Sequence, residues 1–346
     1  MSFVPAEAFA ACLIAFMLAW IGVRVTLAYA RRRGLLDLPG RRRSHVLPTP
    51  RGAGLGLLLG VMPLATWAWL VWTPPEDTAT VAVILVACAL VMLAGWIDDH
   101  GGVRAPVRLA VHFVAAGLAA WAVLHGHGYG PWWVNFALGV ALVLATAWSI
   151  NAHNFMDGID GLLGLQSVFC FSAIGVLAVA SGQPGHALAV WCIAAGCLAF
   201  LAFNLPPARI FMGDVGSGTL GLLVAVCAAL LWRRVPATLW PLLMLCSAFV
   251  TDATLTLLKR ILAGRRWYTA HREHLYQWLV RCGVSHVGAG MGYMSWNLLL
   301  AAPAAWWATV QPNRAAWLAA VLYALAALLW FVARHACLRA VRQGRA

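Results

Sequence analysis

The residues of this 346-residue chain best suited to chemistry are aspartates placed beside glycine, asparagine and histidine. Asp98 and Asp99 are adjacent in the run GWIDDHG, which ends a long apolar stretch. Paired carboxylates suit Mg²⁺, a hard cation usually held by one or two carboxylates together with substrate phosphates. One of the two could instead accept a proton from a nucleophile. A polar helix end is the non-catalytic alternative for the pair.

A denser polar run, NAHNFMDGIDGL, covers residues 151–162. Asp157 and Asp160 are three residues apart, so they share a face if the run is helical. The glycine that follows each aspartate allows a ligand to approach the backbone closely. Asn151 and Asn154 add candidate substrate contacts. The alternative is a polar turn between helices, but this density of polar side chains favours a binding site.

The segment NLPPARIFMGDVGSG, residues 204–218, leads into another apolar stretch. Asp214 stands at the predicted N-terminus of that helix, where backbone amides attract anions. A carboxylate there can hold a metal ion beside a bound phosphate, or it can simply cap the helix. Phe211 could stack on a base, although packing is the alternative role for a phenylalanine near a membrane face.

Two basic stretches complete the set. Residues 269–277, TAHREHLYQ, contain His271, Arg272 and His274, and Arg51 follows a run of three arginines. Arginine makes bidentate contacts with phosphate oxygens, so both stretches suit a pyrophosphate. The His-x-x-His spacing could bind zinc, but no set of further ligands accompanies it. Each stretch taken singly is equally typical of a solvated basic loop.

Composition places these clusters in a membrane protein. Hydrophobic residues make up 63% of the chain and charged residues only 10%, whereas a soluble domain carries about 25% charged residues. Backbone polar groups in lipid must be satisfied within each spanning segment, and the apolar runs are long and continuous, so we predict an all-α polytopic protein. Runs of roughly 20 apolar residues predict eleven spans, at residues 8–30, 52–73, 79–97, 106–124, 132–149, 161–180, 187–204, 216–232, 237–258, 289–308 and 315–335.

Basic residues set the predicted orientation. Lys and Arg favour the cytoplasmic side, and they gather in residues 31–51, in residues 259–288 and in the C-terminal tail. We therefore expect the N-terminus outside the cell and the C-terminus in the cytoplasm. This topology explains much of the net charge of +13, so no nucleic-acid partner is implied. The nine cysteines include no CxxC pair and predict neither a disulfide framework nor a metal cluster.

The acidic residues give the clearest functional signal. Eight of the eleven map to cytoplasmic loops or to the inner ends of spans. Topology calls for basic residues on that side but not for acids, and a divalent cation is the simplest reason to gather carboxylates. We expect residues 1–346 to form a single transmembrane catalytic domain. Its active-site loops are expected near residues 31–51, 98–105, 150–160, 205–215 and 259–288.

Taken in order, these motifs resemble the polyprenyl-phosphate N-acetylhexosamine-1-phosphate transferases. The resemblance covers nearly the whole chain, from DLPGRRRSHVLPTPRGAG through GWIDDH, NAHNFMDGIDGL, NLPPARIFMGDVGSG and HREHLYQ. It implies an enzyme of the bacterial inner membrane, facing the cytoplasm, that transfers a sugar 1-phosphate from a UDP-N-acetylhexosamine to undecaprenyl phosphate and releases UMP. The product would initiate cell-surface glycan synthesis, such as that of O-antigen. The implied cofactor is Mg²⁺, with Mn²⁺ as the alternative ion, and a homodimer is left open.

The resemblance also implies roles for single residues. Asp214 would ligate the metal, Asp98 and Asp99 would serve the metal or the acceptor phosphate, and Asp157 and Asp160 would line the nucleotide site. Asn204 and Phe211 match positions near the uridine, and His271 and His274 match a histidine motif placed against the diphosphate. With the residues themselves, the candidate catalytic set is Asp98, Asp99, Asp157, Asp160, His271 and His274. The substrate-binding set is Asn151, Asn154, Asn204, Phe211, Arg51 and Arg272, and the metal set is Asp214, Asp98, Asp99 and Asp157.

The chain departs from one branch of the family. The branch that transfers phospho-N-acetylmuramoyl-pentapeptide has three consecutive histidines where this chain has HREH, and the sole lysine here is Lys259. The resemblance is therefore closer to the O-antigen-initiating branch, and the pentapeptide transferase remains an alternative. An ion-coupled transporter is an alternative of another class, but such proteins need acids near the midplane, where only Asp252 is a candidate. A non-catalytic scaffold would leave the conjunction of motifs unexplained.

Overall fold

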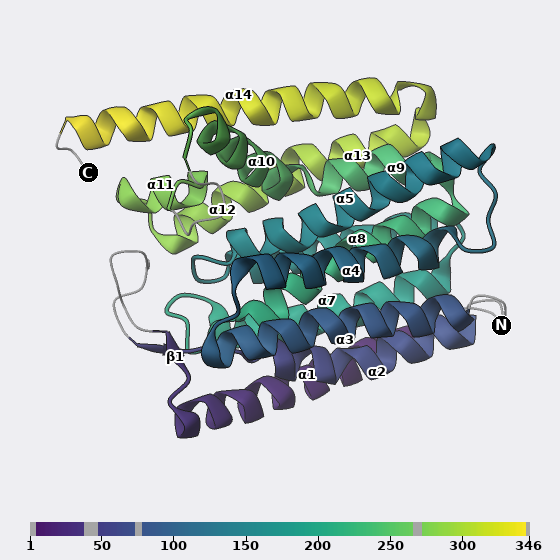
Figure 1. Cartoon of the computed structure of the whole chain (residues 1–346), viewed down its shortest axis with the longest axis horizontal. Helices are drawn as coiled ribbons and strands as arrows, with labels where there is room; N and C mark the ends of the chain where they lie inside the picture. The colour runs from purple at the N-terminus through teal and green to yellow at the C-terminus, as the bar shows by residue number, and fades with distance from the viewer. Residues whose placement is uncertain (1–4, 38–47, 73–77, 266–271, 344–346) are drawn as a thin grey trace.

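The computed structural model describes residues 5–37, 48–72, 78–265 and 272–343, and these form a bundle of long helices (Figure 1). The long helices are α1 (Pro5–Arg33), α2 (Ala53–Trp72), α3 (Thr78–Gly101), α4 (Ala105–Leu124), α5 (Trp132–Met156), α6 (Leu162–Ala180), α7 (Pro184–Asn204), α8 (Asp214–Arg234) and α14 (Ala315–Arg342). The shorter ones are η2 (Pro236–Thr238), α9 (Leu239–Leu245), α10 (Ser247–Leu262), α11 (Leu275–Arg281), α12 (His286–Trp296), η3 (Asn297–Ala301), α13 (Ala302–Val310) and η4 (Pro312–Arg314).

The expected polytopic helical architecture is confirmed. Among the described residues nine helices are long and apolar enough to cross a membrane, and a tenth span results if the bent pair of α9 and α10 is counted as one. In the same residues the strands are β1 (Leu36–Asp37) and β2 (Thr49–Pro50), which pair antiparallel with Leu36 opposite Pro50. Within residues 31–51, expected as an active-site loop, this short ladder joins the two sides of the segment that the structure does not describe.

Two of the predicted spans are interrupted. The predicted span 237–258 consists of α9 and α10, which are bent by 66° at their junction. The predicted span 289–308 is divided by η3, a π-helical segment of five residues. π-Segments inside helices are rare and favour places where the regular backbone pattern must be interrupted. Apolar run length predicts neither interruption, because it reports only that a segment suits lipid.

Helix α8 lies at the centre of the bundle. In its most apolar stretch 78% of the residues are buried, against 17% for α5, so α8 is enclosed by protein and α5 is much less covered. α8 packs against α3 and α5. The most enclosed of the long helices are α6, α7 and α8, which follow the NAHNFMDGIDGL motif or flank the FMGDVGSG motif.

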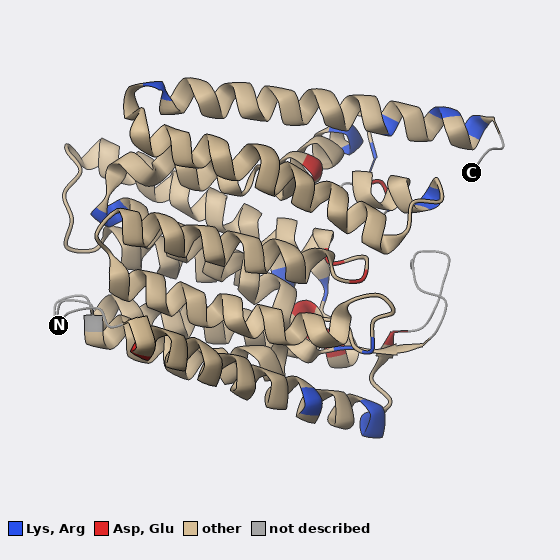
Figure 2. Ribbon diagram, turned by 180° about the vertical axis from the view of Figure 1, so that it is seen from behind, with Lys and Arg blue, Asp and Glu red and all other residues tan. Residues whose placement is uncertain are grey.

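Glycines bring the backbones around the start of α8 into close contact. A Cβ added to Gly54 would lie 2.1 Å from the Cα of Gly216, and one added to Gly95 would lie 2.4 Å from the amide nitrogen of Val215. Small residues allow this approach between membrane helices. The first turn of α8 is thereby fixed between α2 and α3, toward the end of the bundle where most of the acidic residues gather (Figure 2).

Candidate active site

The loop before α8 is tied to the segment before α2. The amide of Phe211 donates to the carbonyl of Pro50 at 2.8 Å, and the carbonyl of Phe211 accepts from the amides of Gly52 and Ala53 at 3.1 and 3.0 Å. Gly213 has a φ of 77°, and a Cβ there would lie 2.5 Å from an oxygen of Asp99. Glycine is therefore required at this position. These bonds bring Arg51 and Phe211, which are distant in sequence, to one place.

Asp99 lies at the N-terminus of α8. Its two carboxylate oxygens accept from the amides of Asp214 at 3.1 Å and Val215 at 3.3 Å, and the residue is only 3% exposed. The Arg51 guanidinium donates to the Asp99 carbonyl, and its Nε lies 4.0 Å from the carboxylate. The amides at the start of α8, which the sequence suggested for a phosphate, therefore donate to the Asp99 carboxylate. Asp99 thus takes the capping role that was the alternative for Asp214.

Asp98 and Asp214 share one cation. A single guanidinium nitrogen of Arg108 donates to a carboxylate oxygen of Asp98 and, at 2.8 Å, to one of Asp214. The other oxygen of Asp98 accepts from the backbone amide of Val103. The other oxygen of Asp214 accepts from the side-chain amide of Asn154 at 2.8 Å. This arrangement joins α3, α4, α5 and α8. Sequence reasoning missed Arg108, although a basic residue at the inner end of an apolar run beside Asp98 was a usable signal.

Asp160 is engaged by two loops. One carboxylate oxygen accepts from the amide of Ala208 at 3.0 Å, and the other lies 3.3 Å from Nδ1 of His286, at the start of α12. Asn204 links the loop of Asp160 to that of Ala208, because its side-chain oxygen accepts from the Gly161 amide at 2.9 Å and its side-chain nitrogen donates to the Ile210 carbonyl at 3.0 Å. Asn204 is only 3% exposed. Both residues thus hold the loops together, and His286 was not foreseen.

Asp157 follows the end of α5 and is half-buried. Removal from solvent raises the pKa of its carboxyl group well above the usual range, and the neighbouring carboxylates of Asp214, Asp99, Asp37 and Asp160 raise that pKa further. These interactions place acids from four segments of the chain near one another. Asp37, from β1, belongs to this group although it was not among the predicted site residues.

The amides at the inner end of α5 have different surroundings. Asn154 reaches the centre of the cluster through Asp214 and also donates to the Ser217 hydroxyl at 3.0 Å. Asn151 donates to the carbonyl of Ala147 one turn earlier at 2.7 Å, and its oxygen lies 3.3 Å from a ring nitrogen of His112 on α4. His112 is a further neighbour that the sequence did not suggest.

The histidine motif is only partly present among the described residues. His271 lies outside them, so its predicted role stays a prediction. His274 is 3% exposed, and its ring stacks with those of Phe155 and Tyr276 at 6.0 and 5.9 Å between centroids. Burial lowers the pKa of His274 below its ordinary value. The predicted contact of this ring with a diphosphate would need it to be uncovered.

Arg272, which follows His271, is described and half-buried. Its neighbour Glu273 is paired with Arg260 and, at 2.8 Å, with Arg265. The acidic residue of HREH therefore serves an ion-pair network within the loop. The basic residues of the motif remain predicted phosphate contacts.

The donor types in the acidic cluster suit a hard cation, although no ready cage is present. In the parts of the chain that the structure describes, no group of three His, Cys, Asp or Glu side chains is arranged to hold a metal ion. Arg108 lies between two of the candidate ligands, Asp98 and Asp214, and occupies the position that a shared metal ion would take. Mg²⁺ usually takes only one or two protein carboxylates together with water and substrate phosphates. The residues therefore fit the ion by chemistry and by number.

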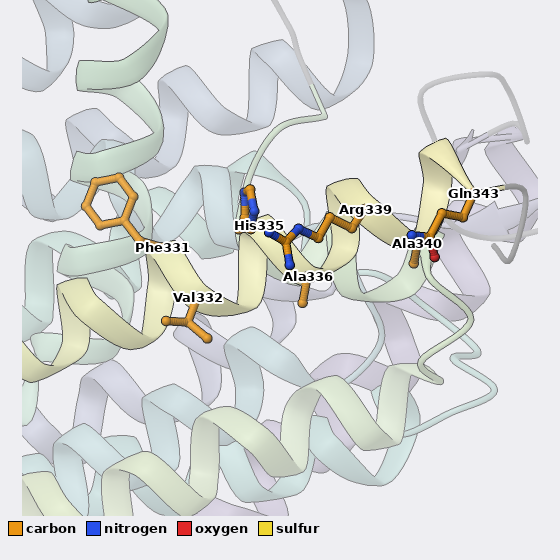
Figure 3. Close-up of a pocket in the computed structure, with 7 residues that line it drawn as sticks. All are labelled: Phe331, Val332, His335, Ala336, Arg339, Ala340 and Gln343. Carbon is orange, nitrogen blue, oxygen red and sulfur yellow. The ribbon is translucent and has the colours of Figure 1, made fainter.

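A surface hollow on α14 lies apart from this cluster (Figure 3). It is lined by Phe331, Val332, His335, Ala336, Arg339, Ala340 and Gln343, all of α14. None of the predicted site residues borders it. Phe331 and Val332 are more than half exposed, as expected of side chains that face lipid.

Comparison with known proteins defines the class. Residues 81–232 match the model of glycosyl transferase family 4. A decaprenyl-phosphate N-acetylglucosaminephosphotransferase of Mycobacterium tuberculosis is 33% identical over 74% of this chain and 72% of its own length. Its counterpart in Mycolicibacterium smegmatis is 31% identical over 93% of this chain and 86% of its own length. An undecaprenyl-phosphate alpha-N-acetylglucosaminyl 1-phosphate transferase of Escherichia coli is 28% identical over 73% of this chain and 71% of its own length.

The chain belongs to glycosyl transferase family 4. Within it the chain is a member of the polyprenyl-phosphate N-acetylhexosamine-1-phosphate transferases, so the resemblance drawn from the sequence motifs is confirmed. The chain is an enzyme, a transferase, and the transporter and scaffold alternatives are set aside.

Proposed function

We propose that this protein transfers an N-acetylhexosamine 1-phosphate from a UDP-sugar to undecaprenyl phosphate and so initiates a bacterial cell-surface glycan. The observation that carries the proposal is the acidic cluster around the start of α8, where Arg108 bridges Asp98 and Asp214 and the Asp157 carboxyl group lies near Asp214. In this reaction an oxygen of the lipid phosphate attacks the β-phosphorus of the UDP-sugar. The bond from that phosphorus to the oxygen bridging the two phosphates breaks, and UMP leaves.

The cationic residues of the cluster suit the charges of this reaction. The phosphoryl group in transfer carries negative charge, and fixed cations that meet it lower the barrier. Arg108 on α4 and Arg51 before α2 border the same aspartates. We assign them to the phosphates of the two substrates. Asp157, whose pKa is raised by burial and by the neighbouring carboxylates, is the candidate for proton transfer.

Mg²⁺ is the proposed cofactor. When bound it would neutralise phosphate charge as a Lewis acid. Asp214, with Asp98 or Asp157, would hold it, because these oxygens border the cluster from three different helix ends. The excess of carboxylates over guanidinium groups in the cluster supports a cation at this place, since like charges at close range are costly.

We further propose eleven membrane crossings, with the N-terminus outside and the acidic cluster facing the cytoplasm of a bacterial inner membrane. Eleven results when both the bent pair and α12–η3–α13 count as crossings. The beginning of α1 and the end of α14 lie at opposite ends of the bundle, which requires an odd number (Figure 1). Cysteine placed at Arg314 should react with an impermeant reagent in intact cells, and cysteine at Arg33 should not. The reverse pattern would overturn the orientation.

The central experiment is a substrate panel. Purified protein in detergent with undecaprenyl phosphate and Mg²⁺ should release UMP from a UDP-N-acetylhexosamine and form a lipid-linked pyrophosphoryl sugar. UDP-N-acetylmuramoyl-pentapeptide should give no comparable turnover, because the relatives described above are named for N-acetylglucosamine. Turnover of the pentapeptide substrate at a similar rate would contradict the proposed branch, and release of UMP without lipid product would contradict the acceptor.

A further inference from the structure

The short helix α11 contacts the loop that carries Asp157. The hydroxyl of Tyr276 donates to the carbonyl of Phe155 at 3.0 Å. The same hydroxyl lies where a Cβ on Gly158 would be only 2.0 Å away, so the ring covers this glycine closely. Tyr276 is 1% exposed. Its side chain therefore touches the backbone on both sides of Asp157 without being open to substrate.

α11 is itself anchored by a buried carboxylate. Asp252 on α10 is 2% exposed and accepts from the amide of Leu275, the first residue of α11, at 2.8 Å. It also accepts from Tyr293 on α12 at 2.7 Å and from Trp330 on α14 at 2.8 Å. Three helices other than its own are thus pinned to one side chain. A buried charge with this many donors fixes geometry, because losing any one donor is costly.

We propose that Tyr276 is a positioning residue, which sets the place of Asp157 and Asp160 by holding the backbone from Phe155 to Gly158. The proposal rests on the function proposed above. The hydroxyl is the donor, and since burial raises the pKa of Tyr276 well above its ordinary value it stays protonated. Tyr276 meets no reacting atom. Its loss should therefore displace a carboxylate that acts in the reaction and leave most substrate contacts in place.

The test is Tyr276→Phe, which removes the hydroxyl and keeps the ring. An unsatisfied buried carbonyl and a displaced loop should lower kcat about tenfold, with the KM for the UDP-sugar changed less than about twofold. Tyr323→Phe is the matched control, because the Tyr323 hydroxyl also donates to a backbone carbonyl, that of Leu243, at 2.7 Å. The control should keep the wild-type kcat.

A double-mutant cycle with Gly158→Ala makes the test specific. In the wild-type background the new methyl group collides with the Tyr276 hydroxyl at 2.0 Å, whereas after Tyr276→Phe the nearest ring atom is 2.9 Å away. Gly158→Ala should therefore lower kcat and the thermal midpoint strongly in wild type and much less in the Phe background. Such non-additivity reports direct contact between the two sites.

Each outcome bears on the proposal. A kcat for Tyr276→Phe within twofold of wild type, or additive effects in the cycle, would overturn it. If wild type forms no lipid product, the proposed function fails instead. The double-mutant cycle can then still be measured as thermal midpoints in detergent. Non-additive midpoints would support the contact between Tyr276 and Gly158, and additive midpoints would overturn it.

Discussion

Replacing Arg108 with glutamine tests whether the aspartates that bind its guanidinium group can also bind Mg²⁺. Arg108 bridges Asp98 and Asp214, and the three side chains are 26%, 12% and 31% exposed. Exposed ion pairs contribute about 0–1 kcal/mol, and removing one partner of a buried pair costs about 3–5 kcal/mol. This half-buried bridge should therefore cost roughly 2 kcal/mol of folding stability when Arg108 is removed.

Mg²⁺ should offset that loss if the same acids bind it. A ligand at 100 times its dissociation constant stabilises the folded state by about 2.7 kcal/mol, so saturating Mg²⁺ should bring Arg108→Gln near the wild-type thermal midpoint. Wild type should gain less, because the ion must compete with Arg108. Turnover of the variant should nevertheless fall, since a cation is lost from the phosphates.

The assay is thermal unfolding in detergent with and without Mg²⁺, together with UMP release. Arg260→Gln is the control, because it breaks another ion pair, with Glu273, away from the cluster; these two side chains are 6% and 17% exposed. That variant should lose stability without a larger response to Mg²⁺. An equal Mg²⁺ response in wild type and Arg108→Gln would refute the assignment of Asp98 and Asp214 as the metal site.

Three further outcomes are expected. Asp214→Asn keeps the contact with Asn154 in shape but removes the charge, so the protein should fold while turnover falls about 100-fold and the half-saturating Mg²⁺ concentration rises; unchanged Mg²⁺ dependence would contradict this. His286→Ala removes the partner of Asp160 and should cost about 1 kcal/mol of stability in thermal unfolding, with no effect expected if the contact is incidental. His274 has a lowered pKa in the folded state, so at pH below about 6.5 the unfolded chain takes up the proton more readily than the folded one. The folded state should therefore lose stability as the pH decreases. His274→Gln should flatten that acid decline in a series of thermal midpoints, and a parallel decline would contradict the assignment.

Much of the fold could be predicted because a lipid environment leaves few choices. Apolar runs of sufficient length must be helices, and the nine long helices correspond to predicted spans. The meeting of the acids was also predictable in outline, since each lies at the same end of alternating helices. The bend at α9–α10 and the π-segment η3 were not, because they depend on how neighbouring helices pack.

The roles of single residues were harder to predict, and the aspartate pair shows why. Successive residues on a helix point roughly 100° apart, so Asp98 and Asp99 face different neighbours despite their adjacency. Asp99 turns to the amides of α8 and Asp98 to Arg108 on α4. Which carboxylate meets which partner depends on helix packing, and the packing depends on glycines such as Gly95 that carry no chemical signal of their own.

Asp252 shows how the structure separates a structural acid from a functional one. It was the only acid deep enough to suggest ion coupling, and a coupling acid must be able to release its proton or bind a cation along a path. The Asp252 carboxylate instead accepts from Thr256, Leu275, Tyr293 and Trp330 at 2.7–3.1 Å. These donors occupy both carboxylate oxygens. The acid that looked most like a transporter's is thus the anchor of the loop that completes a transferase site.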